Sequence, residues 1–370
     1  MNTLPFPDPS FIDRDPNKVL SDQIKQWETL TGKPLYPAQV EHLLINLVSY
    51  REILMRVGIQ EAAKQNLVEF ARYPVLDFLG ELVGTYRLMP TKATCVLEFK
   101  IPEEKMTRIG FPMGTQVYAG NIVFETIADC ALEPGQTTVS VEAAAKEAGT
   151  FYNNLIPGAL VNLVPPVESS VTVKNITVSQ GGLDMEDDDR FRKRIKLASN
   201  KFATAGPLKA YEYFVLSVRQ DIVTVRVHQP RPGKVRVYPL LETGLPEQTL
   251  LVKIFDTLAD NRIMPLTDEL EVVPPTEVPY AVTMNLKLHY GVEQEATIKS
   301  VENRLKVFAA ELQKKLGQEL VASQWEGEAH KVPGVYRAWC NLTEDPPNSG
   351  PGVWLKNTGI EVLFAGFDQP

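Results

Sequence analysis

The chain has 370 residues, of which 44% are hydrophobic and 23% charged, and its formal net charge is −8. These values are typical of a globular protein with two to three domains of roughly 150 residues each. The acidic balance argues against a general nucleic-acid-binding protein. No run approaches the ~20 apolar residues of a membrane span, and the start carries no signal-peptide pattern, so we expect a cytoplasmic protein without membrane insertion.

The first 36 residues are rich in Pro, Asp and Thr and predict an extended lead with one short helix over 18–30. Such a lead is either disordered or lies on a partner. A long helical pattern opens at Pro37, with an expected bend at Gly58. Apolar residues recur along this helix at heptad-like spacing and form a seam. The seam consists of Val40, Leu43, Leu47, Tyr50, Leu54 and Val57.

This seam has two interpretations. The helix either packs on its own domain or is an arm that bundles with helices of other chains. The lead before it offers little core of its own, which favours the arm.

From about residue 91 the apolar period changes to two, as in a half-buried strand. Short strands with turn signals about every ten residues then continue to residue 178, and predict a small antiparallel barrel or sandwich over 90–178. Cys95 falls on the apolar face of the first strand and is expected in the core. Cys95, Cys130 and Cys340 are far apart and form no C-x-x-C, so we expect free thiols.

The stretch from Gly181 to Pro207 has the signals of a helix with both ends marked. Asp184 is the predicted N-cap, and the acidic residues 186–189 fill the first turn, where the helix dipole favours negative charge. Phe191, Ile195 and Ala198 form one apolar stripe. Ala205-Gly206-Pro207 would end this helix and start the next.

The rest of the chain predicts two α+β domains, a central one over 179–277 and a C-terminal one over 278–370. In the central domain a helix (208–218), a two-stranded hairpin (221–240), a helix (246–259) and a strand (268–273) predict helices on one face of an antiparallel sheet. In the C-terminal domain an alternating strand (278–290) is followed by an amphipathic helix (298–316) and further strands (335–342, 360–364). The predicted fold class is therefore multidomain α+β, with an N-terminal helical arm over 1–89.

Candidate chemistry is sparse. The acidic run from Asp184 to Asp189 lacks EF-hand spacing, and the four histidines form no ligand pattern. No nucleotide-binding motif and no nucleophile elbow occurs. We therefore predict no catalytic residue, no metal and no cofactor. A basic hairpin is either a contact for an acidic partner or a solvated sheet face; it carries Arg219, Arg226, Arg231, Lys234 and Arg236.

The motif from Gly181 to Pro207, a Gly-Gly-x-Asp turn, an acidic run, an Arg-rich helix and a Thr-Ala-Gly-Pro restart, resembles the baseplate J-like proteins of contractile phage tails and related injection systems. The resemblance covers roughly residues 76–320. It is carried as well by three upstream segments and one downstream segment: Leu79–Phe99, Phe111–Val117, Glu147–Ala159 and Met264–Val282.

The resemblance implies a structural component of the baseplate wedge and no enzyme. Its partners would be other copies of itself, other wedge subunits, the sheath-initiator protein and the tail hub, without nucleic acid. The arms would form a trimeric bundle, and residues 278–370 would be a dimerisation domain that links wedges into a six-fold ring around the tube. Receptor contact would change the angles between domains and release the sheath to contract. The protein would reside in the baseplate of a virion tail or a cell-derived contractile particle, assembled in the bacterial cytoplasm.

Two alternatives remain open from the residues alone. One is a soluble glycan-active hydrolase with two acidic residues roughly 5–10 Å apart in a deep pocket. The other is a carbohydrate-binding adaptor. Both would use an exposed platform of Trp325, Trp339 and Trp354 with Tyr336, although a small domain's core is the commoner explanation for such a cluster.

Overall fold

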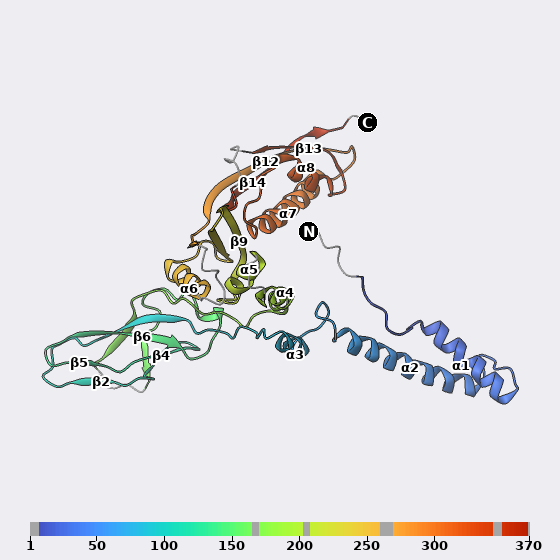
Figure 1. Cartoon of the computed structure of the whole chain (residues 1–370), viewed down its shortest axis with the longest axis horizontal. Coiled ribbons are helices and arrows are strands. Elements are labelled where there is room, and N and C mark those ends of the chain that lie inside the picture. The colour runs from blue at the N-terminus through green and yellow to red at the C-terminus, as the bar shows by residue number, and fades with distance from the viewer. Residues whose placement is uncertain (1–6, 165–169, 203–207, 260–268, 343–349, 369–370) are drawn as a thin grey trace. The chain divides into compact units, whose positions relative to one another are not determined.

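A computed structural model describes residues 7–164, 170–202, 208–259, 269–342 and 350–368 (Figure 1). The chain divides into two compact units, one of Met1–Arg87 with Asp187–Lys196 and one of Leu88–Glu186 with Leu197–Pro370. The first unit is helical and the second holds a β-barrel and two α+β regions, which confirms the predicted fold class. Among the described helices, none combines the length and the apolarity that crossing a bilayer requires.

The described residues of the first unit form four helices: α1 (Pro16–Thr31), α2 (Val40–Lys64), α3 (Val75–Leu82) and α4 (Asp188–Leu197). Asp15 caps the start of α1 by accepting a hydrogen bond from the Asn17 amide, and Gly32, at φ 65°, ends that helix in the left-handed region. The expected bend at Gly58 does not interrupt α2, which continues to Lys64.

The described part of the lead, residues 7–15, lies along α2 of the same chain. Gln60 binds this segment with two hydrogen bonds. Its side-chain oxygen accepts a hydrogen bond from the Phe11 amide, and its side-chain nitrogen donates one to the Pro9 carbonyl. Arg56 donates to the Asp13 carbonyl, and Lys64 pairs with Asp8. The prediction that this segment is disordered or lies on a partner is wrong for these residues, because polar side chains of α2 satisfy their backbone groups.

A small core joins α4 to α3 within the first unit. Ala71, Leu76, Phe191 and Ile195 are buried together. Gly80 lies so close to Phe191 that a Cβ built on it would come within 2.5 Å of the ring. Only glycine fits this position, so α3 approaches α4 directly over the phenylalanine.

The barrel is the first part of the second unit. Its strands are β1 (Thr94–Lys100), β2 (Ile109–Phe111), β3 (Gln116–Ala119), β4 (Ile122–Thr126), β5 (Cys130–Leu132), β6 (Thr138–Ala145), β7 (Asn162–Val164) and β8 (Thr172–Asn175), with a 3₁₀ turn at Thr150–Tyr152. Six of them form an antiparallel sheet in the order β7-β3-β4-β6-β1-β8, and β2 pairs with β5. Phe99 and Phe111 stack in its core with ring centroids 4.1 Å apart, and Cys95 is buried there as predicted.

The central region follows a 3₁₀ turn at Ala198–Phe202 and comprises α5 (Leu208–Leu216), β9 (Ile222–Arg231), β10 (Lys234–Leu241), α6 (Gln248–Leu258) and β11 (Glu269–Val272). The helices pack their apolar residues on one sheet, as predicted. However, β11 pairs in parallel with β10, so the expectation of a wholly antiparallel sheet is wrong. The link from β10 to β11 runs through α6, and such a helical crossover returns a strand in the same direction. The predicted restart at Ala205–Pro207 lies outside the described residues.

The C-terminal region contains β12 (Thr276–Leu288), α7 (Gln294–Gln313), α8 (Ala322–His330), β13 (Val335–Leu342) and β14 (Val353–Phe367). Its sheet has the order β13-β12-β14, with β12 antiparallel to β13 and parallel to β14. Both helices contribute to the core on one face of this sheet (Figure 1). Trp325 is buried there and makes T-shaped ring contacts with Tyr280 and Phe308.

Candidate partner interface

The contact between α1 and α2 is unusually polar for two packed helices. Ser49 donates to the Gln23 side chain at 2.7 Å, and Gln23 in turn donates to Glu52. The hydrogen bonds from Arg56 and then from Gln23 hold the pKa of Glu52 below its ordinary value. The only buried apolar side chains of the two helices are Val19 and Ile45. The hairpin is therefore held together mainly by hydrogen bonds.

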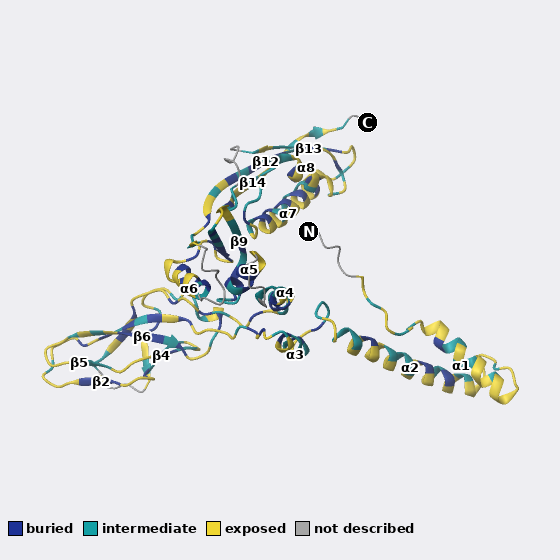
Figure 2. Ribbon diagram, viewed as in Figure 1, coloured by how far each residue is buried: buried dark blue, intermediate teal, exposed yellow. Residues whose placement is uncertain are grey.

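The predicted seam points away from this contact. Its residues Val40, Leu43, Leu47, Tyr50, Leu54 and Val57 are each between 41% and 69% exposed, and Figure 2 shows much of α2 as exposed. Soluble proteins rarely leave so many large apolar side chains contiguous in water unless a partner covers them. The assignment of the seam as a partner interface stays a prediction.

A second apolar stripe on α2 was missed by the sequence reasoning. Leu44, Val48, Met55 and Ile59 are each 54–63% exposed. At about 100° per residue, this stripe, the seam and the face toward α1 point in three directions roughly 90–150° apart. The spacing of 4, 7 and 4 residues between these four side chains is itself a helical pattern. It is overlooked in the sequence because the seam alone is enough to predict an amphipathic helix.

The second stripe borders a groove. Trp27 and Leu30 of α1 line it together with Leu44 and Val48 of α2, and its volume is about 360 Å³. The helical arm thus offers one apolar face on α2 alone and one that both helices build.

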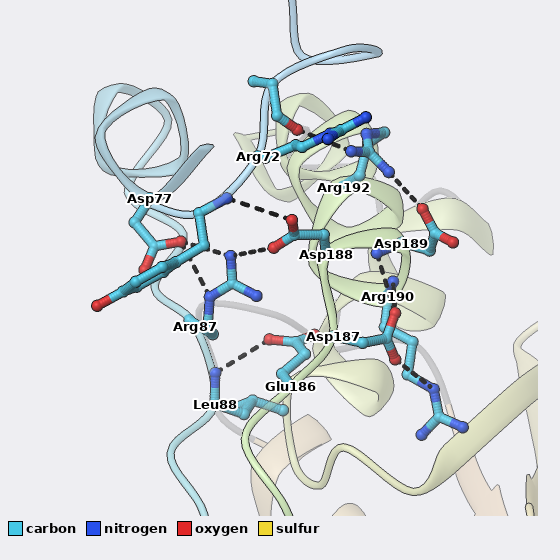
Figure 3. A network of polar contacts seen from close by, with 12 residues as sticks. Arg72, Asp77, Arg87, Leu88, Glu186, Asp187, Asp188, Asp189, Arg190 and Arg192 are labelled. Carbon is cyan, nitrogen blue, oxygen red and sulfur yellow. Dashed lines mark hydrogen bonds and ion pairs between the residues drawn. The ribbon is translucent and has the colours of Figure 1, made fainter. Parts of the chain in front are cut away.

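An arginine joins the segment before the barrel to the start of α4 (Figure 3). Arg87 donates to Asp77 at 2.6 Å and to Asp188 at 2.7 Å, and its guanidinium lies 4.7 Å from the Phe191 ring centroid. Burial alone would raise the pKa of Asp188, but the hydrogen bonds from Arg87 and the Tyr73 amide outweigh it and lower that pKa. The side chain of Arg87 is almost completely buried, whereas those of Asp77 and Asp188 are about one third exposed, so the two pairs lie at the border of the packed region.

The basic side of α4 binds the chain that leads from α2 to the barrel. Arg192 donates to the carbonyls of Val68 and Ala71, and Arg194 donates to the carbonyl of Tyr86. Lys196 pairs with Glu69. The acidic and basic residues of the motif therefore fix residues 68–87 on α4 rather than forming a catalytic or metal site.

The predicted N-cap of this helix is wrong. Asp187 performs that role, because its carboxylate accepts hydrogen bonds from the amides of Asp189 and Arg190. Asp184 instead accepts from the amide and hydroxyl of Thr150. Glu186 accepts from the Leu88 amide at 3.0 Å (Figure 3). These long-range hydrogen bonds hold residues 184–186 outside the helix, so α4 begins at Asp188 rather than directly after Asp184.

The basic residues of the hairpin form ion pairs with acidic residues of the same sheet. Arg231 and Lys234 pair with Glu269, and Arg236 pairs with Glu271, both on β11. The hydrogen bonds from these cations hold the pKa values of both glutamates below their ordinary values. Arg219 pairs with Asp221 at its own strand end. This arrangement supports the solvated sheet face over a contact with an acidic partner.

The residues behind the alternative hypotheses are not gathered into a site. Trp325 and Trp354 are buried, so they are not part of an exposed platform, whereas Tyr336 is exposed. His289 contacts Asp368 at 3.2 Å near the end of β12. Within the described ranges no group of three or more His, Cys, Asp or Glu side chains is arranged to hold a metal ion.

Comparison with known proteins gives three family matches in chain order. Residues 103–182 match the barrel domain of baseplate J-like proteins, residues 203–274 their central domain, and residues 280–360 their C-terminal domain. Baseplate protein J of Escherichia phage P2 is 27% identical over 155 residues, which are 41% of this chain and 51% of that protein. The match thus spans about half the length of that relative.

A solved structure gives the same fold over most of the chain. A chain in the cryo-EM structure of the anti-feeding prophage baseplate, symmetrised six-fold, superposes with a TM-score of 0.51 at 14% identity. The superposition covers 92% of this chain and 90% of that one. With barrel, central and C-terminal domains matched in succession, the chain belongs to the baseplate J-like family.

Proposed function

We propose that this protein is a structural component of the baseplate wedge of a contractile tail or injection particle. In this role its copies link wedges into a six-fold ring around the tube and relay the trigger for sheath contraction. Family membership, the likeness to phage P2 baseplate protein J and the superposition on a six-fold baseplate support this function.

The observation that carries the proposal is the distribution of polar and apolar side chains on the helical arm, which is the reverse of that in an ordinary helical hairpin. Its internal contact is polar, and two apolar faces of α2 are exposed. Each large apolar side chain contributes about 1.5–3 kcal/mol when it is fully buried, so covering both faces would strongly favour association. Two faces suit a helix that touches two neighbours in a bundle, with other copies and other wedge subunits, the sheath initiator and the hub as its partners.

The motif on α4 supports the mechanical part of the proposal. Arg192 and Arg194 of α4 bind the segment that connects the arm to the barrel, and Arg87 of that segment binds Asp188 of α4. A segment held in this way transmits a displacement of the arm instead of absorbing it as loose chain. Changes in inter-domain angle would then release the sheath. A baseplate solved before and after contraction with identical angles would contradict this relay.

Recovery of the tagged protein from a lysate in which tails assemble tests the function. Wild type is expected to be recovered in a large particle with sheath, tube and other baseplate subunits. Leu47→Asp with Leu54→Asp, in the seam, is expected to be recovered without them, because two charges enter a buried bundle. Val307→Asp on α7, also exposed, is the matched control and should behave as wild type.

The two parts of the proposal fail separately. Wild-type protein recovered without tail components would refute the baseplate function. Seam variants that enter the particle as efficiently as Val307→Asp would leave the baseplate function intact and remove the seam from the interface.

A further inference from the structure

A small buried cluster joins the central and C-terminal regions within the second unit. Leu240 of β10 is buried together with Leu316 and Trp354, and Tyr238 packs against them. Leu316 follows α7 and Trp354 lies on β14, so both regions contribute to the cluster. It is distinct from the two larger cores that the regions form on their own sheets.

In this cluster each region places an aromatic ring on a glycine of the other. Tyr238 of the central region lies on Gly352, where an added Cβ would come within 2.3 Å of the ring. Trp354 of the C-terminal region lies on Gly244, where an added Cβ would be 3.3 Å from the ring. The indole nitrogen of Trp354 donates to the Gln313 carbonyl at 2.9 Å, which orients this ring. The two regions therefore approach each other closely at two points, and at the first there is no room for a methyl group.

The chain that connects the two regions is short and stiff. Val273 still belongs to the central sheet, because its amide donates to the Val237 carbonyl. Thr276 already belongs to the C-terminal sheet, because its amide donates to the Gly352 carbonyl. Only a Pro-Pro pair, residues 274–275, lies between them. Each proline fixes its own φ and restricts the residue before it, so this link has little rotational freedom.

We propose that the central and C-terminal regions form one rigid body, held by the two ring-on-glycine contacts and the Pro-Pro link. A hinge needs a few residues that absorb large changes of φ and ψ, and the prolines do not provide them. Rotation about the link would also open the buried cluster or press the Tyr238 ring into the backbone of Gly352.

The rigidity is a property of the single chain, and only its consequence rests on the proposed function. If a change of inter-domain angle relays the trigger for contraction, that change does not occur between the central and C-terminal regions. These two regions would then move together as one lever.

A distance measurement across the joint tests the proposal in the full chain. Spin labels are attached to Val252→Cys on α6 and Lys299→Cys on α7, two exposed positions in the two regions. Burial raises the pKa of Cys95 to about 12 and that of Cys340 to about 11, and it also raises the pKa of Cys130, so the native thiols should label slowly near neutral pH. Pulsed electron paramagnetic resonance is expected to give one narrow distribution of distances.

Two variants remove the first ring-on-glycine contact in opposite ways. Gly352→Ala is expected to broaden the distribution about twofold, because the added methyl group displaces the Tyr238 ring and overpacks the cluster. Tyr238→Ala should broaden it without any clash, and it keeps the test valid if Gly352→Ala does not fold. Gly327→Ala on α8, where an added Cβ meets nothing within 4 Å, is the matched control and should keep the distribution narrow.

The outcomes separate the inference from the function. A broad distribution in the labelled chain without further substitutions, or a narrow one that neither variant broadens, overturns the proposed joint and leaves the baseplate function intact. In a baseplate solved before and after contraction, the angle between the central and C-terminal regions is expected to stay the same while other angles change. A change in that angle would overturn the rigid body and support the relay, whereas identical angles throughout would contradict the relay alone.

Discussion

Helices α2 and α7 carry similar apolar patterns and are covered in opposite ways. Val301, Leu305 and Leu312 of α7 are buried against the C-terminal sheet. Leu43, Leu47 and Leu54 of α2 are exposed. The period of apolar residues shows that each segment is a helix with an apolar face, but it does not show whether the same chain covers that face. In α2 the residues between the apolar ones do show it, because polar Ser49 and Glu52 bond to α1 and Gln60 bonds to the lead.

The same substitution in both helices gives the largest contrast. Leu305→Ala is expected to lower the free energy of unfolding of the C-terminal domain by about 2–5 kcal/mol, because it leaves a cavity in a packed core. Leu47→Ala is expected to change stability by no more than about 0.5 kcal/mol in the dilute chain. Urea titration followed by the fluorescence of buried Trp325 and by circular dichroism measures both. Equal losses would mean that the seam packs within the chain.

The attachment of the arm to α4 gives a smaller effect. Arg87→Lys keeps the charge but loses the planar fork that reaches both Asp77 and Asp188. We expect residues 68–87 to lose about 1–3 kcal/mol of local stability, read as faster amide hydrogen exchange. The matched control is Lys196→Ala, which removes a largely exposed pair worth about 0–1 kcal/mol. Equal exchange in the two variants would show that Arg87 contributes no more than a surface ion pair.

Acid should loosen this attachment as Asp188 becomes protonated. The pKa of Asp188 is lower in the folded chain than in the unfolded chain. Its contribution is therefore fully present above the unfolded value of about 4 and is lost as the pH falls through the folded pKa. Hydrogen exchange of residues 68–87 should accelerate below about pH 4, corrected for intrinsic rates. Asp188→Asn should abolish this acid-dependent part, and an unchanged profile in that variant would assign it to another carboxylate.

Thiol labelling compares the exposure of the two regions with the smallest expected disturbance of the fold. Burial raises the pKa of Cys340 to about 11, so it should react slowly at pH 8. A cysteine placed at the exposed position of Leu47 should react at nearly the rate of a free thiol. Mass spectrometry after a short pulse of iodoacetamide measures both sites in one chain. Protection of the introduced thiol in the dilute protein, lost on unfolding, would indicate a covered seam.

Much of the fold could be predicted because local periodicity reports directly on burial. The uninterrupted alternation from Val278 to Leu288 gave β12, and the turn residues between short strands gave the barrel. The N-cap could not be predicted, because Asp184 and Asp187 are equally good caps locally. Thr150, which lies 34 residues away from Asp184, decides between them. The parallel pairing of β11 is also a long-range property that no local pattern encodes.

The candidate site could be predicted only in part for the same reason. The seam follows from spacing, whereas the second stripe requires knowing which face of α2 lies on α1. For Trp325 and Trp354 the sequence suggests a site that the structure does not contain. Their proximity in sequence suggested a platform, but packing against Phe308 and a hydrogen bond from Trp354 to the Gln313 carbonyl place them inside.

The discontinuous first unit has a consequence for biosynthesis. Asp188 follows its partner Tyr73 by 115 residues, and Phe191 is made later still. At roughly 5–20 residues per second, a ribosome needs about 6–23 s to cover that distance. During this interval Leu76 and its neighbours have emerged without the aromatic ring that covers them. The arm therefore gains its anchor only after the barrel sequence has been translated, and nascent chains that stall within the barrel would display an unanchored arm to the chaperones of the cell.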